Sequence, residues 1–221
     1  MESQPPKVLL LSDVIVSFIY SPQVRQRFSD VSLLIGCGDL AYYYIEYVLN
    51  ALDVPCFFVR GNHDKIVEYS LEAQRTSPNG SINLHSKVIN HQGILFAGVE
   101  GSLRYRIGSF QYTQAQMWRH VFRLTPQLMV NRLRYGRYLD VFVTHAPPAG
   151  IHDMPDLPHK GINAFRWVLN VFQPTYHFHG HIHIYRPDTP VDTLFHRTRV
   201  INAFSYREVA LDLDLNIKPG Q

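Results

Sequence analysis

The feature that most constrains this chain is a set of five short polar segments, each placed at the end of an apolar run. The segments are Ser12-Asp13, Gly38-Asp39, Gly61-Asn62-His63-Asp64, Thr144-His145-Ala146 and Gly180-His181-Ile182-His183. Short, continuously apolar runs predict strands that are covered on both faces. Ligand sites in open α/β sheets lie outside the carboxyl ends of the strands, so the five segments are expected to meet in space.

Strand and helix patterns alternate along the chain, which predicts an α/β fold. Strands are expected at 7–12, 31–36, 55–60, 94–99 and 140–144, and two more at 198–203 and 207–213 complete a sheet. Helices are expected at 40–52 and 161–172, with a short one opening at Ser21-Pro22. A further helix is predicted over 110–123, and Thr125 as an N-cap before Pro126 predicts a separate helix toward Arg134.

Length and composition favour one domain over residues 1–221. The chain is 46% hydrophobic and 18% charged, as in soluble globular proteins. No apolar run approaches the roughly 18 residues that span a bilayer, and the first six residues lack a secretory signal pattern. We therefore expect a cytoplasmic protein without a membrane partner. The two cysteines, Cys37 and Cys56, give neither a disulfide framework nor a thiolate metal cluster.

The five segments together offer carboxylate, amide and imidazole ligands for metal ions. Their order resembles the calcineurin-like metallophosphoesterase superfamily, whose signature runs Asp-x-His, Gly-Asp, Gly-Asn-His-Asp/Glu, a lone His and Gly-His-x-His. The resemblance covers about residues 7–212. It implies a four-layer sandwich of two mixed β-sheets flanked by helices. The alternative is that the aspartates are ordinary caps at strand ends and the histidines polar core residues, which leaves the shared order of the segments unexplained.

The resemblance also implies a ligand set for two metal ions. Asp39 would bridge both ions, Asp13 and His183 would bind the first ion, and the second ion would be bound by Asn62, His145 and His181. One or two divalent ions are expected, manganese first, with iron, zinc or nickel as alternatives, because imidazole suits these metals better than magnesium or calcium.

The resemblance further implies a reaction. His63 would serve as proton donor or transition-state stabiliser, with Asp64 orienting it. The expected activity is that of a metal-dependent phosphoesterase, a phosphodiesterase being favoured. It would hydrolyse a small phosphate ester by in-line attack of a metal-bound hydroxide.

One position departs from the family pattern. Where the signature places a histidine two residues after the first aspartate, this chain has Ile15, which cannot bind a metal. Occupancy of the first metal site is therefore open. The departure also motivates an alternative function, a non-catalytic binding or scaffold module that keeps the fold, although such a module would need neither His63 nor Asp64.

Two loop-rich segments are candidates for substrate contact. Residues 101–139 hold seven arginines and no acidic residue, which favours anions. Within this stretch and the later segment 144–161 the candidates are Arg104, Tyr105, Arg106, Tyr112, His152, Asp153 and His159. The competing interpretation of the first stretch is a solvated basic loop. A nuclease remains a further alternative, not favoured, because no stacking or groove-reading motif accompanies the arginines.

Overall fold

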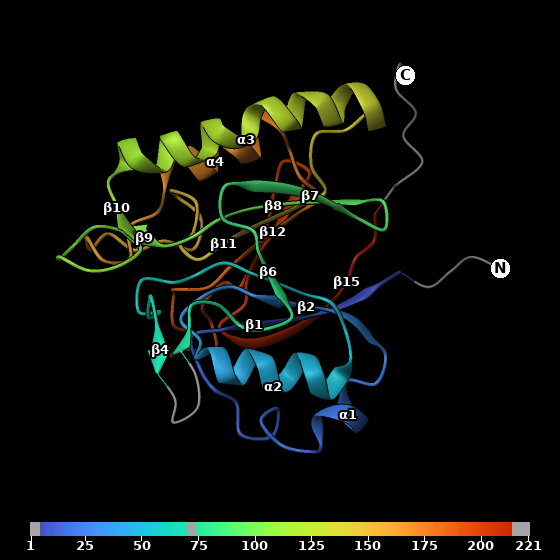
Figure 1. Ribbon diagram of the computed structural model, residues 1–221. Coiled ribbons are helices and arrows are strands. Elements are labelled where there is room, and N and C mark those ends of the chain that lie inside the picture. The colour runs from blue at the N-terminus through green and yellow to red at the C-terminus, as the bar shows by residue number, and fades with distance from the viewer. Residues whose placement is uncertain (1–4, 70–73, 214–221) are drawn as a thin grey trace.

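Two stacked β-sheets form the centre of the molecule, and helices cover the outer face of each (Figure 1). The computed structural model describes residues 5–69 and 74–213. The first sheet has the order β15-β1-β2-β3-β6, parallel except for β15. Its strands are β1 (Lys7–Ser12), β2 (Val31–Gly36), β3 (Cys56–Phe58), β6 (Ser81–Asn83) and β15 (Ser205–Ala210).

The second sheet has the order β13-β14-β12-β11-β8-β7. Its inner strands are parallel, whereas β13 and β7 at the two edges are antiparallel to their neighbours. The strands are β7 (Lys87–His91), β8 (Ile94–Val99), β11 (Val141–Thr144), β12 (Tyr176–His179), β13 (Asp192–Phe195) and β14 (Thr198–Asn202). Both sheets are thus mixed.

Helices α1 (Val24–Arg27) and α2 (Tyr42–Leu52) pack on the first sheet, and α3 (Gln114–Tyr135) and α4 (Asn163–Val171) pack on the second. Two small ribbons extend from the side where the parallel strands end (Figure 1). They are formed by β4 (Glu68–Tyr69) with β5 (Gln74–Arg75), and by β9 (Ser102–Leu103) with β10 (Gln111–Tyr112).

The continuously apolar strands follow from this layering, because alternate side chains of one strand face different layers. In β1, Val8 and Leu10 pack between the two sheets, whereas Leu9 and Leu11 face the helices. In β11, Phe142 belongs to the cluster under α3 and α4, and its neighbours Val141 and Val143 face the other sheet. Three apolar clusters therefore fill the three interfaces, which confirms the predicted four-layer α/β sandwich.

The prediction of two helices around Thr125 is wrong. Residues 114–135 form one helix with Pro126 inside it, begun by a capping box between Thr113 and Gln116. The buried stripe of Met117, Val121, Leu124 and Leu128 runs past the proline without a break, so packing on the sheet outweighs the lost backbone hydrogen bond. In the described part of the chain, no helix is long and apolar enough to cross a membrane.

Candidate metal centre

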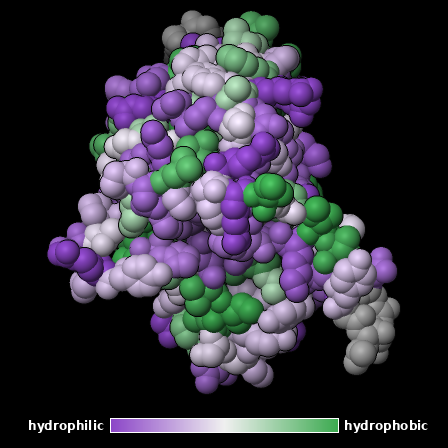
Figure 2. Space-filling view, turned by 90° about the vertical axis from the view of Figure 1, so that its left-hand side faces the viewer, coloured by the Kyte–Doolittle hydropathy of each residue, from purple (hydrophilic) through white to green (hydrophobic). Residues whose placement is uncertain are grey.

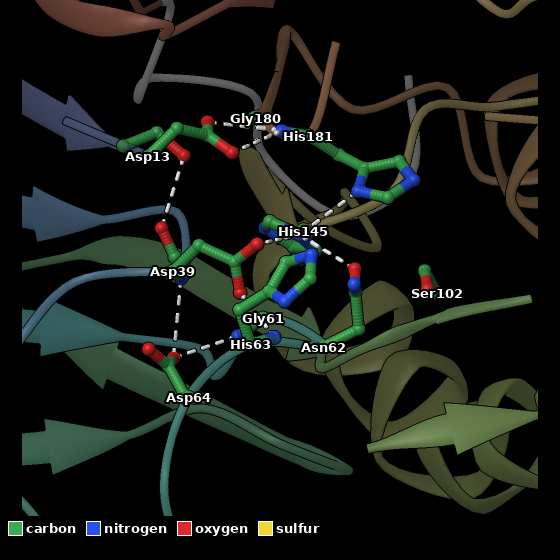
Figure 3. Close-up of polar contacts among 12 residues, drawn as sticks. Asp13, Asp39, Gly61, Asn62, His63, Asp64, Ser102, His145, Gly180 and His181 are labelled. Atoms are coloured by element: carbon green, nitrogen blue, oxygen red, sulfur yellow. Dashed lines mark hydrogen bonds and ion pairs between the residues drawn. The ribbon is translucent and has the colours of Figure 1, made fainter. Parts of the chain in front are cut away.

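The polar segments gather where the strands of the two sheets end, and Figure 3 shows side chains from both sheets pointing toward one another. Asp39 and Asn62 come from the loops after β2 and β3, and His145 and His181 from the loops after β11 and β12. Nε2 of His145 lies 3.3 Å from Oδ2 of Asp39, 3.1 Å from Oδ1 of Asn62 and 3.1 Å from Nδ1 of His181. The second-ion ligand set predicted from the sequence is therefore brought together in space.

Backbone carbonyls fix which ring nitrogens face this centre. Nδ1 of His145 lies 2.8 Å from the carbonyl oxygen of Cys37, and Nε2 of His181 lies 2.8 Å from that of Pro158. Each of these outer nitrogens must carry a proton to donate, so the inner nitrogen of each neutral ring presents a lone pair. The inner lone pairs meet two side-chain oxygens and no donor hydrogen among the four, an arrangement that fits a divalent cation.

Electrostatics agrees that the centre attracts positive charge. Burial opposes protonation of His145, but the carboxylate of Asp39 outweighs it and raises the pKa of His145 to about 9. Without a metal ion the ring therefore takes up a proton on Nε2, at the position where a bound cation would replace it. Burial opposes ionisation of Asp39, and His145 and the backbone N–H of His63 outweigh it, so that its pKa falls to about 2. Asp39, His145 and His181 offer ligand atoms that all lie within 4.8 Å of one another.

The backbone at this centre is held in sparsely populated conformations. Asp13, Asp39 and His181 all have left-handed backbones, with φ of 66°, 57° and 68°. Such strain in non-glycine residues costs on the order of 1–3 kcal/mol each and clusters at functional sites. Two glycines allow the close approach of the loops. A Cβ on Gly61 would lie 2.0 Å from Oδ1 of Asp39, and one on Gly180 would lie 1.8 Å from Oγ of Ser12.

Asp13 and His183, the ligands expected for a first ion, form a second pair at the edge of the centre. Nε2 of His183 lies 3.6 Å from Oδ1 of Asp13, which raises the pKa of His183. The buried Asp13 carboxylate also accepts the backbone N–H of His181, at 3.0 Å to Oδ2. Ile15 is 41% exposed and leaves the position of the expected histidine without a ligand.

His63 lies beside the centre and is exposed. Its backbone N–H donates to Oδ1 of Asp39 at 2.7 Å, and its ring Nδ1 lies 3.4 Å from Nη2 of Arg106. Because a guanidinium only donates, this contact places a lone pair on Nδ1 and leaves the ring proton on Nε2. The loop between β9 and β10 supplies a second contact, since Nδ2 of Asn62 donates to the hydroxyl of Tyr105 at 3.3 Å.

The Asp64 carboxylate contacts backbone groups of two loops. Its carboxylate accepts the backbone N–H groups of Gly61, Leu40 and Asp39, at 2.7, 2.9 and 3.2 Å. Burial and the nearby charge of Asp39 raise the pKa of Asp64 to about 7. The structure therefore gives Asp64 the task of tying the loop after β2 to the loop after β3. That Asp64 orients the His63 ring stays a prediction, beside these three backbone contacts.

Most of the candidate substrate residues have contacts within the fold. Arg104 donates to the carbonyl of Gln111, and the hydroxyl of Tyr112 donates to Glu100 at 2.8 Å. His152 bridges His179 and Thr193 with both ring nitrogens, and Asp153 accepts from the backbone of Gly150 and Gly161. All four side chains therefore have partners within the fold, and their contact with a substrate stays a prediction.

Besides Arg106, two of the candidates lie close to the centre. The hydroxyl of Tyr105 contacts Asn62, as described above, and the ring of His159 lies 5.4 Å from that of His181. His159 is itself paired with Asp156 at 2.6 Å. The carbonyls of Cys37 and Pro158 were missed, and no sequence signal could have found them, because every residue type carries a backbone carbonyl.

The sequence model of the calcineurin-like phosphoesterases matches residues 6–185. The chain belongs to the calcineurin-like phosphoesterase family. Members of this family depend on divalent metal ions and act on phosphate esters. In this chain, oxygen and imidazole donors come together from the loops after β2, β3, β11 and β12.

Solved structures share the fold at low sequence identity. One is the protein TT1561 of Thermus thermophilus, with 14% identity and a TM-score of 0.62, covering 94% of this chain and 95% of that one. Another is GAP50, the anchor in the inner membrane complex of Plasmodium, with 12% identity and a TM-score of 0.53, covering 90% of this chain and 71% of that one. No curated protein has a sequence that matches this calcineurin-like phosphoesterase.

Proposed function

We propose that the protein is a metal-dependent phosphodiesterase. The observation that supports this most strongly is the convergence of Asp39, Asn62, His145 and His181 through oxygen and ring-nitrogen atoms that are metal ligands in proteins. We propose manganese as the preferred metal, with iron, zinc or nickel as alternatives, because two imidazoles with two oxygen donors suit a borderline metal. A bound divalent ion supplies a lowered pKa for coordinated water and neutralises charge on phosphoryl oxygens.

The chain's own residues supply the remaining chemistry. The His63 ring, with its hydrogen on Nε2, donates a hydrogen bond to the oxygen of the departing alcohol and stabilises the negative charge that develops there. Arg106 holds the ring in this tautomer, and its planar guanidinium also offers donors to a phosphoryl oxygen. The hydroxyl of Tyr105 accepts from Nδ2 of Asn62, and Oδ1 of the same amide faces His145. A diester is favoured because an alkoxide leaving group gains most from a hydrogen-bond donor at its oxygen.

The test is hydrolysis of bis-p-nitrophenyl phosphate and of an alkyl diester in the presence of Mn²⁺. We expect turnover that a chelator abolishes and that Asp39→Asn removes. His63→Ala is expected to slow the alkyl diester far more than the nitrophenyl ester, because p-nitrophenolate leaves without protonation. Activity that resists the chelator, or full activity in Asp39→Asn, would contradict the proposal.

A second candidate function rests on Ile15. With an exposed isoleucine in place of the family's histidine, the chain offers fewer ligands for a first ion and could act as a non-catalytic scaffold. Metal titration separates the two functions. Binding of Mn²⁺ at micromolar concentration without any phosphodiester hydrolysis, or no binding at all, would favour the scaffold, whereas binding coupled to hydrolysis favours the enzyme.

A further inference from the structure

A cavity of about 280 Å³ opens beside the proposed catalytic centre. Asp39 and His63 belong both to the centre and to the lining of this cavity, which also includes Tyr43, Lys65 and Tyr69. The cavity lies between the start of α2 and the ribbon that begins with β4, on the side of the molecule that faces the viewer in Figure 2. Hydrophilic residues predominate on this side, and apolar residues form small separate groups.

The two tyrosines offer uncovered aromatic surface. Tyr43 is 45% exposed and Tyr69 is 76% exposed. The ring of Tyr43 is supported from behind, because Tyr20 packs edge-on against it with the ring centres 5.8 Å apart. The wall that carries Tyr69 is tied to the helix that carries Tyr43, since Glu68 accepts the backbone N–H of Tyr42 at 2.8 Å. The fold therefore holds the ring of Tyr43 and places the backbone next to Tyr69 beside the helix.

The position of His63 indicates which part of the substrate would lie in the cavity. Arg106 occupies one side of the His63 ring, and the cavity opens on a wall that His63 shares with the metal ligand Asp39. The alcohol whose oxygen accepts the hydrogen bond from Nε2 of His63 must leave from this position, and its remaining atoms extend away from the centre. The cavity is the space next to His63 that can hold them.

We propose that this cavity is the leaving-group subsite and that it takes a planar aromatic alcohol, either a nucleoside or a phenol. The inference rests on the proposed phosphodiesterase function, which it extends to a substrate class. Tyrosine faces stack on planar rings, and Lys65 donates to ring or sugar oxygens at the rim. A lipid tail fits poorly, because Lys65 and Glu68 would lose water without gaining a partner. The volume suits one ring system, since pockets for larger ligands span about 300–1,000 Å³.

The experiment measures equilibrium binding to the metal-free protein, so it does not depend on turnover. The probes are adenosine, uridine, p-nitrophenol and methyl riboside, which keeps the sugar and lacks the ring, and binding is followed by saturation-transfer NMR and calorimetry. The variants are Tyr43→Ala and Tyr69→Ala, with Tyr43→Phe as the matched control that keeps the aromatic face.

We expect adenosine and uridine, or p-nitrophenol, to bind at millimolar concentration or below, and methyl riboside to bind at least fivefold more weakly than the nucleosides. Stacking of one ring predicts a loss of at least about fivefold in Tyr43→Ala and a change within twofold in Tyr43→Phe. Nucleosides binding more tightly than p-nitrophenol identifies a nucleoside leaving group, and the reverse order identifies an aryl one.

Equal binding of methyl riboside and adenosine, or binding that is unchanged in both alanine variants, would overturn the subsite. So would the absence of any binding at millimolar concentration. These failures differ from failure of the proposed function, because an enzyme with an empty cavity would still hydrolyse bis-p-nitrophenyl phosphate in a chelator-sensitive way. A chain that fails that assay while binding the aromatic probes through Tyr43 would lose the phosphodiesterase function and keep a ring-binding site.

Discussion

The buried histidine His177 makes the stability of the chain depend on pH in a way that can be calculated. It lies in β12, fully buried, and its Nε2 is 2.9 Å from the hydroxyl of Thr144. Nδ1 of His177 is buried without a hydrogen-bond partner among the described residues. Burial, reinforced by the charge of His152, lowers the pKa of His177 to about 3. In the unfolded chain a histidine titrates near 6.5.

Between these two values the unfolded chain binds one more proton than the folded chain at this position. The free energy of unfolding therefore falls as the pH decreases below about 6.5, by about 1.4 kcal/mol per pH unit. At pH 5 the loss that His177 contributes is about 2 kcal/mol relative to pH 7. His177→Phe removes the titrating group, and the new ring would lie beside Phe142, whose centroid is 5.0 Å from the histidine ring.

Urea unfolding of the metal-free protein at pH 7, 6 and 5 measures the effect. We expect His177→Phe to lose about 2 kcal/mol less than the wild type between pH 7 and pH 5. At pH 7 the two proteins should differ by only about 1 kcal/mol, because the lost hydrogen bond is offset by removal of the unpaired Nδ1. Thr144→Val is the control, since it removes the hydrogen bond and keeps the titrating ring. Equal losses in the wild type and His177→Phe would refute the reasoning.

Three further predictions concern the site. Arg106→Ala should lower kcat for an alkyl diester by about tenfold or more and kcat for a nitrophenyl ester much less. Arg104→Ala, from the same loop, is the control and should change the two rates by the same factor. If Arg106→Ala also lowered both rates by the same factor, Arg106 would have no role toward His63. Gly180→Ala should lower stability by about 1–3 kcal/mol in urea titrations, because its Cβ would clash with Ser12, and an unchanged midpoint would contradict the fold of this loop. Ile15→His should raise the number of Mn²⁺ ions bound per chain in calorimetry, and an unchanged stoichiometry would show that this position does not face the first metal site.

Much of the fold was predictable because both faces of each central strand are buried. Ile94–Val99 is buried at every position and Val31–Gly36 at every position except Ser32, so both runs are apolar enough to be predicted as strands. The short edge strands and ribbons were not predicted, since partly exposed segments such as Asp192–Phe195 carry little apolar pattern. The helix through Pro126 was predicted as two because local propensity was weighed without the sheet that holds it.

In the candidate site too, some residues could be predicted from the sequence pattern and others depend on the three-dimensional fold. The ligands Asp39 and His145 could be predicted, because strand ends meet at one side of a layered α/β fold. The substrate candidates could not be sorted from the sequence. Arg104 and Arg106 stand two positions apart, yet one is bound to the carbonyl of Gln111 and the other faces His63. Which of them faces the centre depends on the path of a single loop.

Titration of Mn²⁺ into the metal-free protein by calorimetry tests the central claim most directly. The converging lone pairs of Asp39, Asn62, His145 and His181 predict binding at micromolar concentration or tighter in the wild type. We expect Asp39→Asn and His181→Ala to abolish that binding and Asp153→Asn, a loop residue away from the ligand set, to leave it unchanged. No binding by the wild type at micromolar Mn²⁺, or equal binding by Asp39→Asn, would contradict the account.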